Sequence, residues 1–265
     1  MWSLIMRSNL YIAIIIVLNA CAAPTASIAP EINISKNGFL FYIDESVNLH
    51  TNDLLQTIQL PSQNYSVPEY SNLLPNALRE YRAGIHEGID FPTPLNTPIM
   101  AVSGGIVIRS NPTHSDVDIE TYKAFLETTQ LLSKTPDDIY NYILLGKSVI
   151  IDHGYTIVPN FRTISVYAHL STIAEGILPG AQVNKGQVIG LAGNTGTSSG
   201  ALRNDRGVHL HWEIHFENAT GKYFLGQNIP PEMLKDNIDS VSYIHLRAHE
   251  TEADLVCRLL LEKKK

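Results

Sequence analysis

Cysteine, basic residues and long apolar runs are scarce in this chain of 265 residues. Two cysteines allow at most one disulfide, so a small fold held together by several disulfides is excluded. Lys and Arg total 19 against 26 Asp and Glu, which gives a net charge of −7. An acidic chain without basic clusters is not expected to bind nucleic acid, because phosphate binding needs concentrated Lys and Arg. The hydrophobic fraction of 44% is nevertheless sufficient for a folded core, and the length predicts one or two domains.

The first twenty residues have the pattern of an export signal. A single basic residue, Arg7, precedes an apolar run over residues 10–18. That run is about half of the roughly 20 residues that a membrane-spanning helix needs. It ends in L-N-A-C, which resembles the lipobox of bacterial lipoproteins and implies cleavage before Cys21 and attachment of lipid to it. Secretion without lipid, with cleavage at one of the alanines in residues 22–26, is the alternative.

Short runs of β-forming residues separated by Gly and Pro dominate the middle of the chain. Several of them alternate apolar and polar residues, as half-buried antiparallel strands do. The expected strands are Ile99–Val102, Gly105–Arg109, Ser148–Asp152, Thr163–His169, Val188–Ala192 and Val208–Phe216. The sequence therefore predicts a mainly β, antiparallel fold, preceded over residues 30–78 by irregular structure with a strand or two.

One segment between two expected strands has helical spacing instead. Ser115 followed by Asp118 is typical of a helix start, and T-P-D-D predicts a second helix with Thr135 as its N-cap and Gly146 as its end. A helical insertion at about residues 111–147 is therefore expected to interrupt the sheet. A C-terminal helix is expected over residues 250–265.

Several of the ten histidines lie in patterns that suit zinc, which takes His nitrogen and carboxylate oxygen at about 2.0–2.2 Å. His86 and Asp90 would lie about 13 Å apart along a straight strand, so a bend at Gly88 is needed to bring both to one ion. His209 and His211 share one face of a strand about 6.6 Å apart. One of these two can therefore bind metal while the other stands beside it.

Six motifs occur in the order of a known family: H-E-G-I-D-F, P-I-M-A-V-S-G-G-I-V, V-I-I-D-H-G, Y-A-H-L-S, V-N-K-G-Q-V-I-G-L-A-G-N-T-G and H-L-H-W-E-I. Together they resemble the lysostaphin-type (LytM-like) zinc metalloendopeptidases of bacterial cell walls, over about residues 79–216. The resemblance implies a compact antiparallel β-fold with an open groove that holds one zinc ion.

The resemblance also implies a role for each site residue. The implied zinc ligands come from the H-x-x-x-D and H-x-H patterns and are His86, Asp90 and His211. The implied catalytic residues are His169 and His209, and which of them is the base stays open. Tyr81 is the nearest candidate for stabilising the oxyanion, and His153 is interpreted as a turn residue without a metal role.

Two functions fit this resemblance. The favoured one is a zinc-dependent endopeptidase that cleaves peptide stems or cross-bridges of peptidoglycan through a metal-activated water. The alternative is a non-catalytic LytM-like binding protein or an activator of other cell-wall hydrolases. Retention of all five site residues favours the enzyme. A periplasmic zinc carrier would not explain the two additional histidines.

The expected organisation is a signal peptide (1–20), a tether with an irregular region (21–78), a zinc peptidase domain (79–216) and a C-terminal extension (217–265). The expected partners are peptidoglycan peptides, a membrane reached through the lipid anchor, and a regulatory protein. The protein is expected to face the periplasm, anchored in the outer rather than the inner membrane by family analogy, since Ala22 follows the cysteine. The helical insertion is expected to flank the groove and restrict it.

Overall fold

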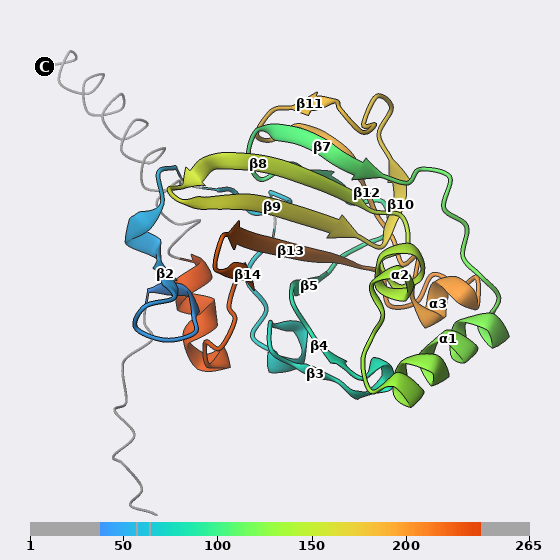
Figure 1. Cartoon of the computed structure of the whole chain (residues 1–265). Helices are drawn as coiled ribbons and strands as arrows, with labels where there is room; N and C mark the ends of the chain where they lie inside the picture. Colours follow the sequence, from blue (N-terminus) through green and yellow to red (C-terminus); the bar gives the residue numbers. More distant parts are fainter. Residues whose placement is uncertain (1–37, 57, 64, 240–265) are drawn as a thin grey trace, which may run out of the picture. The chain divides into compact units, whose positions relative to one another are not determined.

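The computed structural model describes residues 38–56, 58–63 and 65–239, and Figure 1 shows how their strands and helices are arranged. The expected signal peptide, Cys21 and the expected helix over residues 250–265 lie outside these ranges. In the described part of the chain, no helix is long and apolar enough to cross a membrane.

A seven-stranded antiparallel sheet is the largest element of the fold. Its strands follow the order β11–β7–β8–β9–β13–β14, and β5 also pairs with β13. Their bounds are β5 (Ile89–Pro92), β7 (Gly105–Ser110), β8 (Val149–Val158), β9 (Phe161–Ala168), β11 (Gln182–Val183), β13 (His209–Asn218) and β14 (Gly221–Phe224). One edge of β13 pairs with β9, and the other edge pairs first with β5 and then with β14. The mainly β, antiparallel fold is thereby confirmed.

Smaller sheets and short helices complete the described region. The three-stranded sheet has the order β10–β12–β6, and β1–β2 and β3–β4 are two-stranded. The bounds are β1 (Phe39–Tyr42), β2 (Asn48–His50), β3 (Leu78–Arg79), β4 (Gly84–Ile85), β6 (Pro98–Met100), β10 (Leu170–Ile173) and β12 (Val188–Ala192). Single 3-10 turns lie at Thr51–Asp53, Ser71–Leu73 and Glu80–Arg82, α3 spans Ser198–Ala201, and residues 231–239 are helical.

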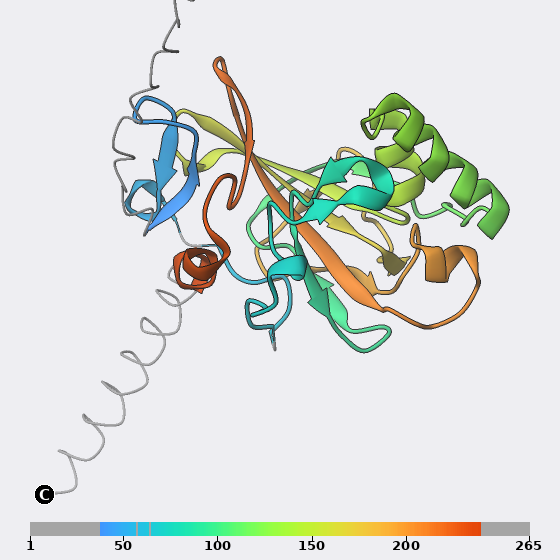
Figure 2. The ribbon, with the colours of Figure 1, turned by 90° about the horizontal axis from the view of Figure 1, so that it is seen from below.

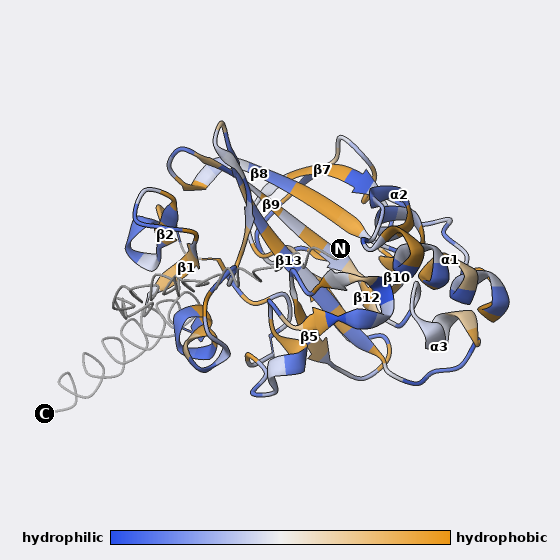
Figure 3. Cartoon of the chain, turned by 60° about the horizontal axis from the view of Figure 1, so that its bottom comes forward, coloured by the Kyte–Doolittle hydropathy of each residue, from blue (hydrophilic) through white to orange (hydrophobic). Residues whose placement is uncertain are grey.

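The main core lies against the large sheet and extends beyond the region that resembles the peptidase family. Tyr167 and Trp212 are fully buried in it, and hydrophobic segments recur along β5, β7 and β8 in Figure 3. Phe41 from β1 stacks on Tyr223 from β14 with ring centroids 4.7 Å apart. Leu234, in the helix over residues 231–239, belongs to the same core. The residues on both sides of the expected peptidase domain therefore share its core.

The segment between β7 and β8 contains the expected helical insertion, but its second helix is short. Helix α1 spans Ile119–Leu132, and the Asp118 side chain caps it by accepting from the Thr121 backbone N–H at 2.9 Å. Helix α2 covers only Asp137–Ile139 and continues as a π-helical turn over Tyr140–Leu144.

The sequence predicted Thr135 as the N-cap of the second helix, but Thr135 does not cap α2. Its hydroxyl instead bonds Arg82, accepting from Nη1 at 3.2 Å and donating to the backbone carbonyl at 2.5 Å. The insertion consequently lies beside the β3–β4 hairpin, as Figures 1 and 2 show.

His153 lies inside β8 and is buried, so its interpretation as a turn residue is wrong. Its Nδ1–H donates to the Gly104 carbonyl at 2.8 Å, and its Nε2 lies 2.7 Å from the Ser165 hydroxyl. The ring thus joins β9 to the residue before β7. It does not belong to the group of potential metal ligands found among the described residues.

Candidate metal centre and active site

The pairing of β5 with β13 places two of the expected zinc ligands face to face. Asp90 lies directly opposite His211 in the antiparallel register, and His209 lies opposite Pro92. On the other edge of β13, His211 pairs with Ala168, the residue before His169. The sheet register therefore brings four of the five expected site residues together.

The fifth residue, His86, reaches the same place because the backbone passes very close to β13 at Gly88. A Cβ at Gly88 would lie 2.5 Å from the Trp212 carbonyl oxygen and 2.9 Å from His211 Cε1. Only glycine fits at such an approach. A bend at Gly88 was expected to bring His86 and Asp90 to one point. The two side chains do converge, and the close packing of Gly88 against β13 is the reason for glycine at this position.

Three potential ligand atoms converge at this point: His86 Nε2, Asp90 Oδ1 and His211 Nδ1. His86 Nε2 lies 3.0 Å from Asp90 Oδ1 and 3.1 Å from His211 Nδ1, and the last two atoms are 2.8 Å apart. Two donors each about 2.0–2.1 Å from a tetrahedral zinc ion lie about 3.3 Å apart. The observed separations fit such an ion after a small expansion, and both imidazoles and a carboxylate are ordinary zinc ligands.

Each of the three potential ligands is oriented by a second partner on its far side. His86 Nδ1–H donates to the Leu74 carbonyl at 2.9 Å, which leaves the Nε2 lone pair for a metal. Arg79 donates to Asp90 Oδ2 at 3.0 Å, and His211 Nε2–H donates to Glu213 Oε1 at 2.7 Å. Such partners fix the tautomer and the direction of a ligand before the metal arrives.

The charges of the cluster follow from these contacts. Burial raises the pKa of Asp90, but the bonds from His211 and His86 outweigh it and hold that pKa well below its usual value. Burial alone would lower the pKa of His211, whereas its bonds to Asp90 and Glu213 raise it to about 9. In the metal-free chain His211 is therefore protonated at neutral pH, so a metal ion must displace a proton from Nδ1.

His169 and His209 lie beside this group, and each of them bonds a backbone carbonyl through Nδ1. His169 Nδ1–H donates to the Thr195 carbonyl at 2.8 Å, and His209 Nδ1–H donates to the Gly207 carbonyl at 2.7 Å. In each ring Nε2 is therefore the nitrogen that does not bond a backbone carbonyl. His209 Nε2 lies 3.8 Å from Asp90 Oδ1, and the two ring centroids lie 4.6 Å apart. Burial, followed by the nearby His209 and His211, lowers the pKa of His169 well below its usual value, so its ring is neutral at pH 7.

An open cavity of about 560 Å³ lies over the cluster and is lined by all five expected site residues. Tyr81 also lines it and is 55% exposed. The helical insertion contributes Tyr122, Leu126 and Tyr140 to the lining. A peptide-sized ligand can thus reach the histidines from solvent, with the insertion forming part of the wall.

Part of the chain is similar to known peptidases. Residues 137–223 match the model of peptidase family M23. The chain is also 29% identical over 133 residues to the peptidoglycan DD-endopeptidase ShyA of Vibrio cholerae serotype O1, a match that covers 50% of this chain and 21% of ShyA. This part of the chain is therefore similar to peptidase family M23. It spans about a fifth of the length of this curated relative.

Solved structures of M23 peptidases are similar to parts of this chain. A zinc-containing peptidase from Vibrio cholerae is 20% identical, with 64% of this chain and 39% of that chain covered and a TM-score of 0.40. The catalytic domain of lysostaphin from Staphylococcus simulans is 21% identical, with 57% of this chain and 80% of that chain covered and a TM-score of 0.33. M23 peptidases are zinc metallopeptidases.

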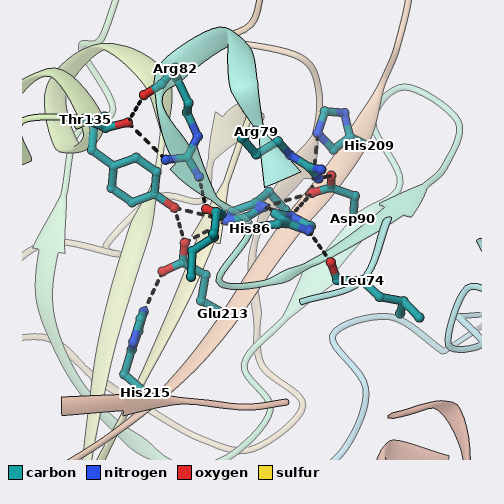
Figure 4. A network of polar contacts seen from close by, with 12 residues as sticks. Leu74, Arg79, Arg82, His86, Asp90, Thr135, His209, Glu213 and His215 are labelled. Carbon is teal, nitrogen blue, oxygen red and sulfur yellow. Dashed lines mark hydrogen bonds and ion pairs between the residues drawn. The ribbon is translucent and has the colours of Figure 1, made fainter. Parts of the chain in front are cut away.

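Three polar residues around the ligand cluster were not assigned to the site from the sequence. Arg79 contacts Asp90, while Tyr140 donates a hydrogen bond to Glu213. Glu213, two residues after His211 on β13, accepts a hydrogen bond from His211 Nε2–H at 2.7 Å. Figure 4 shows Glu213 between His215 and the group around His86. Its i+2 spacing from His211 was the available signal, whereas no local pattern marks Arg79 or Tyr140.

Proposed function

We propose that this protein is a zinc-dependent endopeptidase that hydrolyses peptide bonds of bacterial peptidoglycan. The observation that carries the proposal is the convergence of His86 Nε2, Asp90 Oδ1 and His211 Nδ1 within 4.8 Å of one another, with two further imidazoles beside them. Three protein ligands leave a fourth position open, as hydrolytic zinc sites require.

The proposed roles follow from which atoms each side chain leaves available. A zinc ion bound to His86, Asp90 and His211 would supply a Lewis acid and a water of lowered pKa. His169 and His209 both bond a backbone carbonyl through Nδ1 and keep Nε2 for proton transfer, so one accepts a proton as general base and the other, once protonated, stabilises negative charge on the substrate. Tyr81, at the cavity wall, is the proposed additional donor to the oxyanion.

The substrate proposal rests on the similarity to peptidase family M23 and to ShyA and on the shape of the site. ShyA is named as a peptidoglycan DD-endopeptidase, and the cavity beside the histidines is open to solvent. The test is digestion of purified sacculi by the zinc-loaded protein, with mass analysis of the released muropeptides. We expect soluble fragments in which one peptide bond has been hydrolysed, released far more slowly by the variant His169→Ala. Sacculi that stay intact after incubation with the zinc-loaded wild-type chain would refute the proposal.

The non-catalytic alternative, a binding protein or activator on the same fold, has less support. Such a protein has no need of two further imidazoles beside a complete ligand set. The sacculus digestion also separates the two functions, because a binder would sediment with sacculi and release nothing.

We further propose that Cys21 carries a lipid that holds the protein at the periplasmic face of the outer membrane. The support is the L-N-A-C pattern after a short apolar run. Cys21→Ser is expected to accumulate as an unprocessed precursor or to appear as a soluble product. A fully processed, membrane-bound variant would contradict this proposal.

A further inference from the structure

The carboxylate of Glu213 is the link between the potential metal ligand His211 and the helical insertion. Glu213 is 2% exposed and accepts three hydrogen bonds. Oε1 accepts from His211 Nε2–H at 2.7 Å and from the Tyr140 hydroxyl, and Oε2 accepts from His215 Nε2–H at 2.6 Å. These donors hold the carboxylate in one orientation, and that orientation directs His211 Nδ1 toward Asp90.

Tyr140 is the only one of the three donors that does not come from β13. It lies on the π-helical turn of the insertion, and its hydroxyl oxygen is also 3.4 Å from His211 Nε2. The guanidinium of Arg82 lies over its ring, 5.0 Å from the centroid. The Tyr140 hydroxyl is the donor in its bond to Glu213, because an ionised carboxylate only accepts hydrogen bonds.

The insertion holds this tyrosine in place through a small core that also includes Ala201 of α3. Tyr122, Ile139 and Leu144 are buried together, and Tyr140 packs against them. The end of the insertion also reaches the site, because the Leu145 carbonyl accepts from the His169 backbone N–H at 3.0 Å. The insertion is thus attached to the site at two points.

From these contacts we propose that Tyr140 is a positioning residue for the metal: through Glu213 it fixes His211, and it thereby makes zinc affinity depend on the docked insertion. The inference rests on the proposed function, since it takes zinc to be the ion bound by His211. Outer partners of metal ligands commonly contribute a factor of about 10–100 to metal affinity. Because coupling free energies are reciprocal, zinc must stabilise the docked insertion by the same factor by which docking tightens zinc binding.

The first test compares zinc affinity among the full-length wild type, Tyr140→Phe and Tyr142→Phe, measured by competition with a chromogenic chelator. Tyr142 lies on the same turn, is 64% exposed and contacts Arg109 instead of Glu213, so its variant is the matched control. We expect Tyr140→Phe to weaken zinc binding about 10-fold or more. We expect Tyr142→Phe to bind as the wild type does. Equal affinities in the two variants and the wild type would overturn the inference.

The second test needs no variant and measures the effect of zinc on the insertion. Hydrogen–deuterium exchange of the wild-type chain is measured with and without zinc. We expect zinc to slow exchange over residues 136–145, and unchanged exchange there in a zinc-loaded sample would overturn the inference. A wild type that binds no zinc would overturn the proposed function together with the inference, whereas zinc binding without these effects overturns the inference alone.

Discussion

Asp90 and His211 face each other as a directly opposed pair on the antiparallel strands β5 and β13, with Oδ1 and Nδ1 2.8 Å apart. A register shift of one residue would turn one of these side chains to the opposite face of the sheet. The register that buries the core therefore also builds the metal site. The metal site is therefore expected to form only when β5 and β13 pair in this register.

Replacing any one of the three proposed ligands with alanine is expected to abolish stoichiometric zinc binding. A catalytic zinc site has three protein ligands and one position for water, and two protein ligands are too few to hold the ion tightly. The measurement is metal content of His86→Ala, Asp90→Ala and His211→Ala after gel filtration, beside circular dichroism to confirm folding. One equivalent of zinc retained by folded Asp90→Ala would remove this carboxylate from the ligand set.

His169→Ala is expected to keep zinc and lose most of its hydrolytic rate. The side chain lies beside the ligand set without belonging to it, and loss of a positioned proton-transfer group costs about 10²–10⁴-fold in rate. The measurement is the rate of muropeptide release, with metal content determined on the same sample. His209→Ala serves as the parallel variant, and comparison of the two pH–rate profiles identifies which ring is the base. Near-normal turnover by His169→Ala would exclude it from the mechanism.

The strands were predictable because their alternation of apolar and polar residues is local. The expected strand over residues 208–216 appears as β13 from His209, and that over residues 163–169 appears as β9 up to Ala168. The first helix of the insertion was equally local, since Asp118 alone supplies its cap. Spacing within the H-x-x-x-D and H-x-H patterns then located the histidines that converge.

The contacts that the sequence did not predict join segments far apart in the chain. Thr135 had the sequence of an N-cap, but it bonds Arg82 from a different part of the molecule, and this tertiary contact replaced the local one. Tyr140 had no distinguishing pattern, because its partner Glu213 lies 73 residues away. Which residue of an insertion reaches a buried carboxylate depends on how the insertion packs, and packing has no short-range signal.

Gly88→Ala is expected to disrupt the metal site although Gly88 carries no ligand. Its Cβ would lie 2.5 Å from the Trp212 carbonyl oxygen, so β5 and β13 must move apart or the backbone must shift. Overpacking of this kind costs about 1–3 kcal/mol and here also separates His86 from His211. The measurements are zinc affinity and the urea midpoint of unfolding. Gly104→Ala is the matched control, since its Cβ would meet its nearest neighbour at an ordinary 3.5 Å. Wild-type zinc affinity in Gly88→Ala would show that the close approach is not required.

His153 is expected to make the metal-free protein less stable as the pH falls below about 6.5. Burial lowers the pKa of this ring in the folded chain, while the unfolded chain titrates near the usual value of about 6.5. Below that pH the unfolded state binds more protons than the folded state, so the free energy of unfolding decreases until the folded ring also titrates. The stability contributed by the neutral ring is thus fully present above pH 6.5. Each unit by which the pKa is lowered corresponds to about 1.4 kcal/mol of this loss.

The measurement is urea unfolding of the metal-free wild type and of His153→Gln between pH 7.5 and pH 5. Glutamine offers a donor for the Gly104 carbonyl and an acceptor for the Ser165 hydroxyl but does not titrate. Other buried histidines, including His86 and His169, have lowered pKa values and destabilise both proteins over the same range. The difference between the two pH dependences therefore isolates His153, and the wild type should lose more stability than the variant. Parallel curves would mean that the ring is not held neutral by burial in β8.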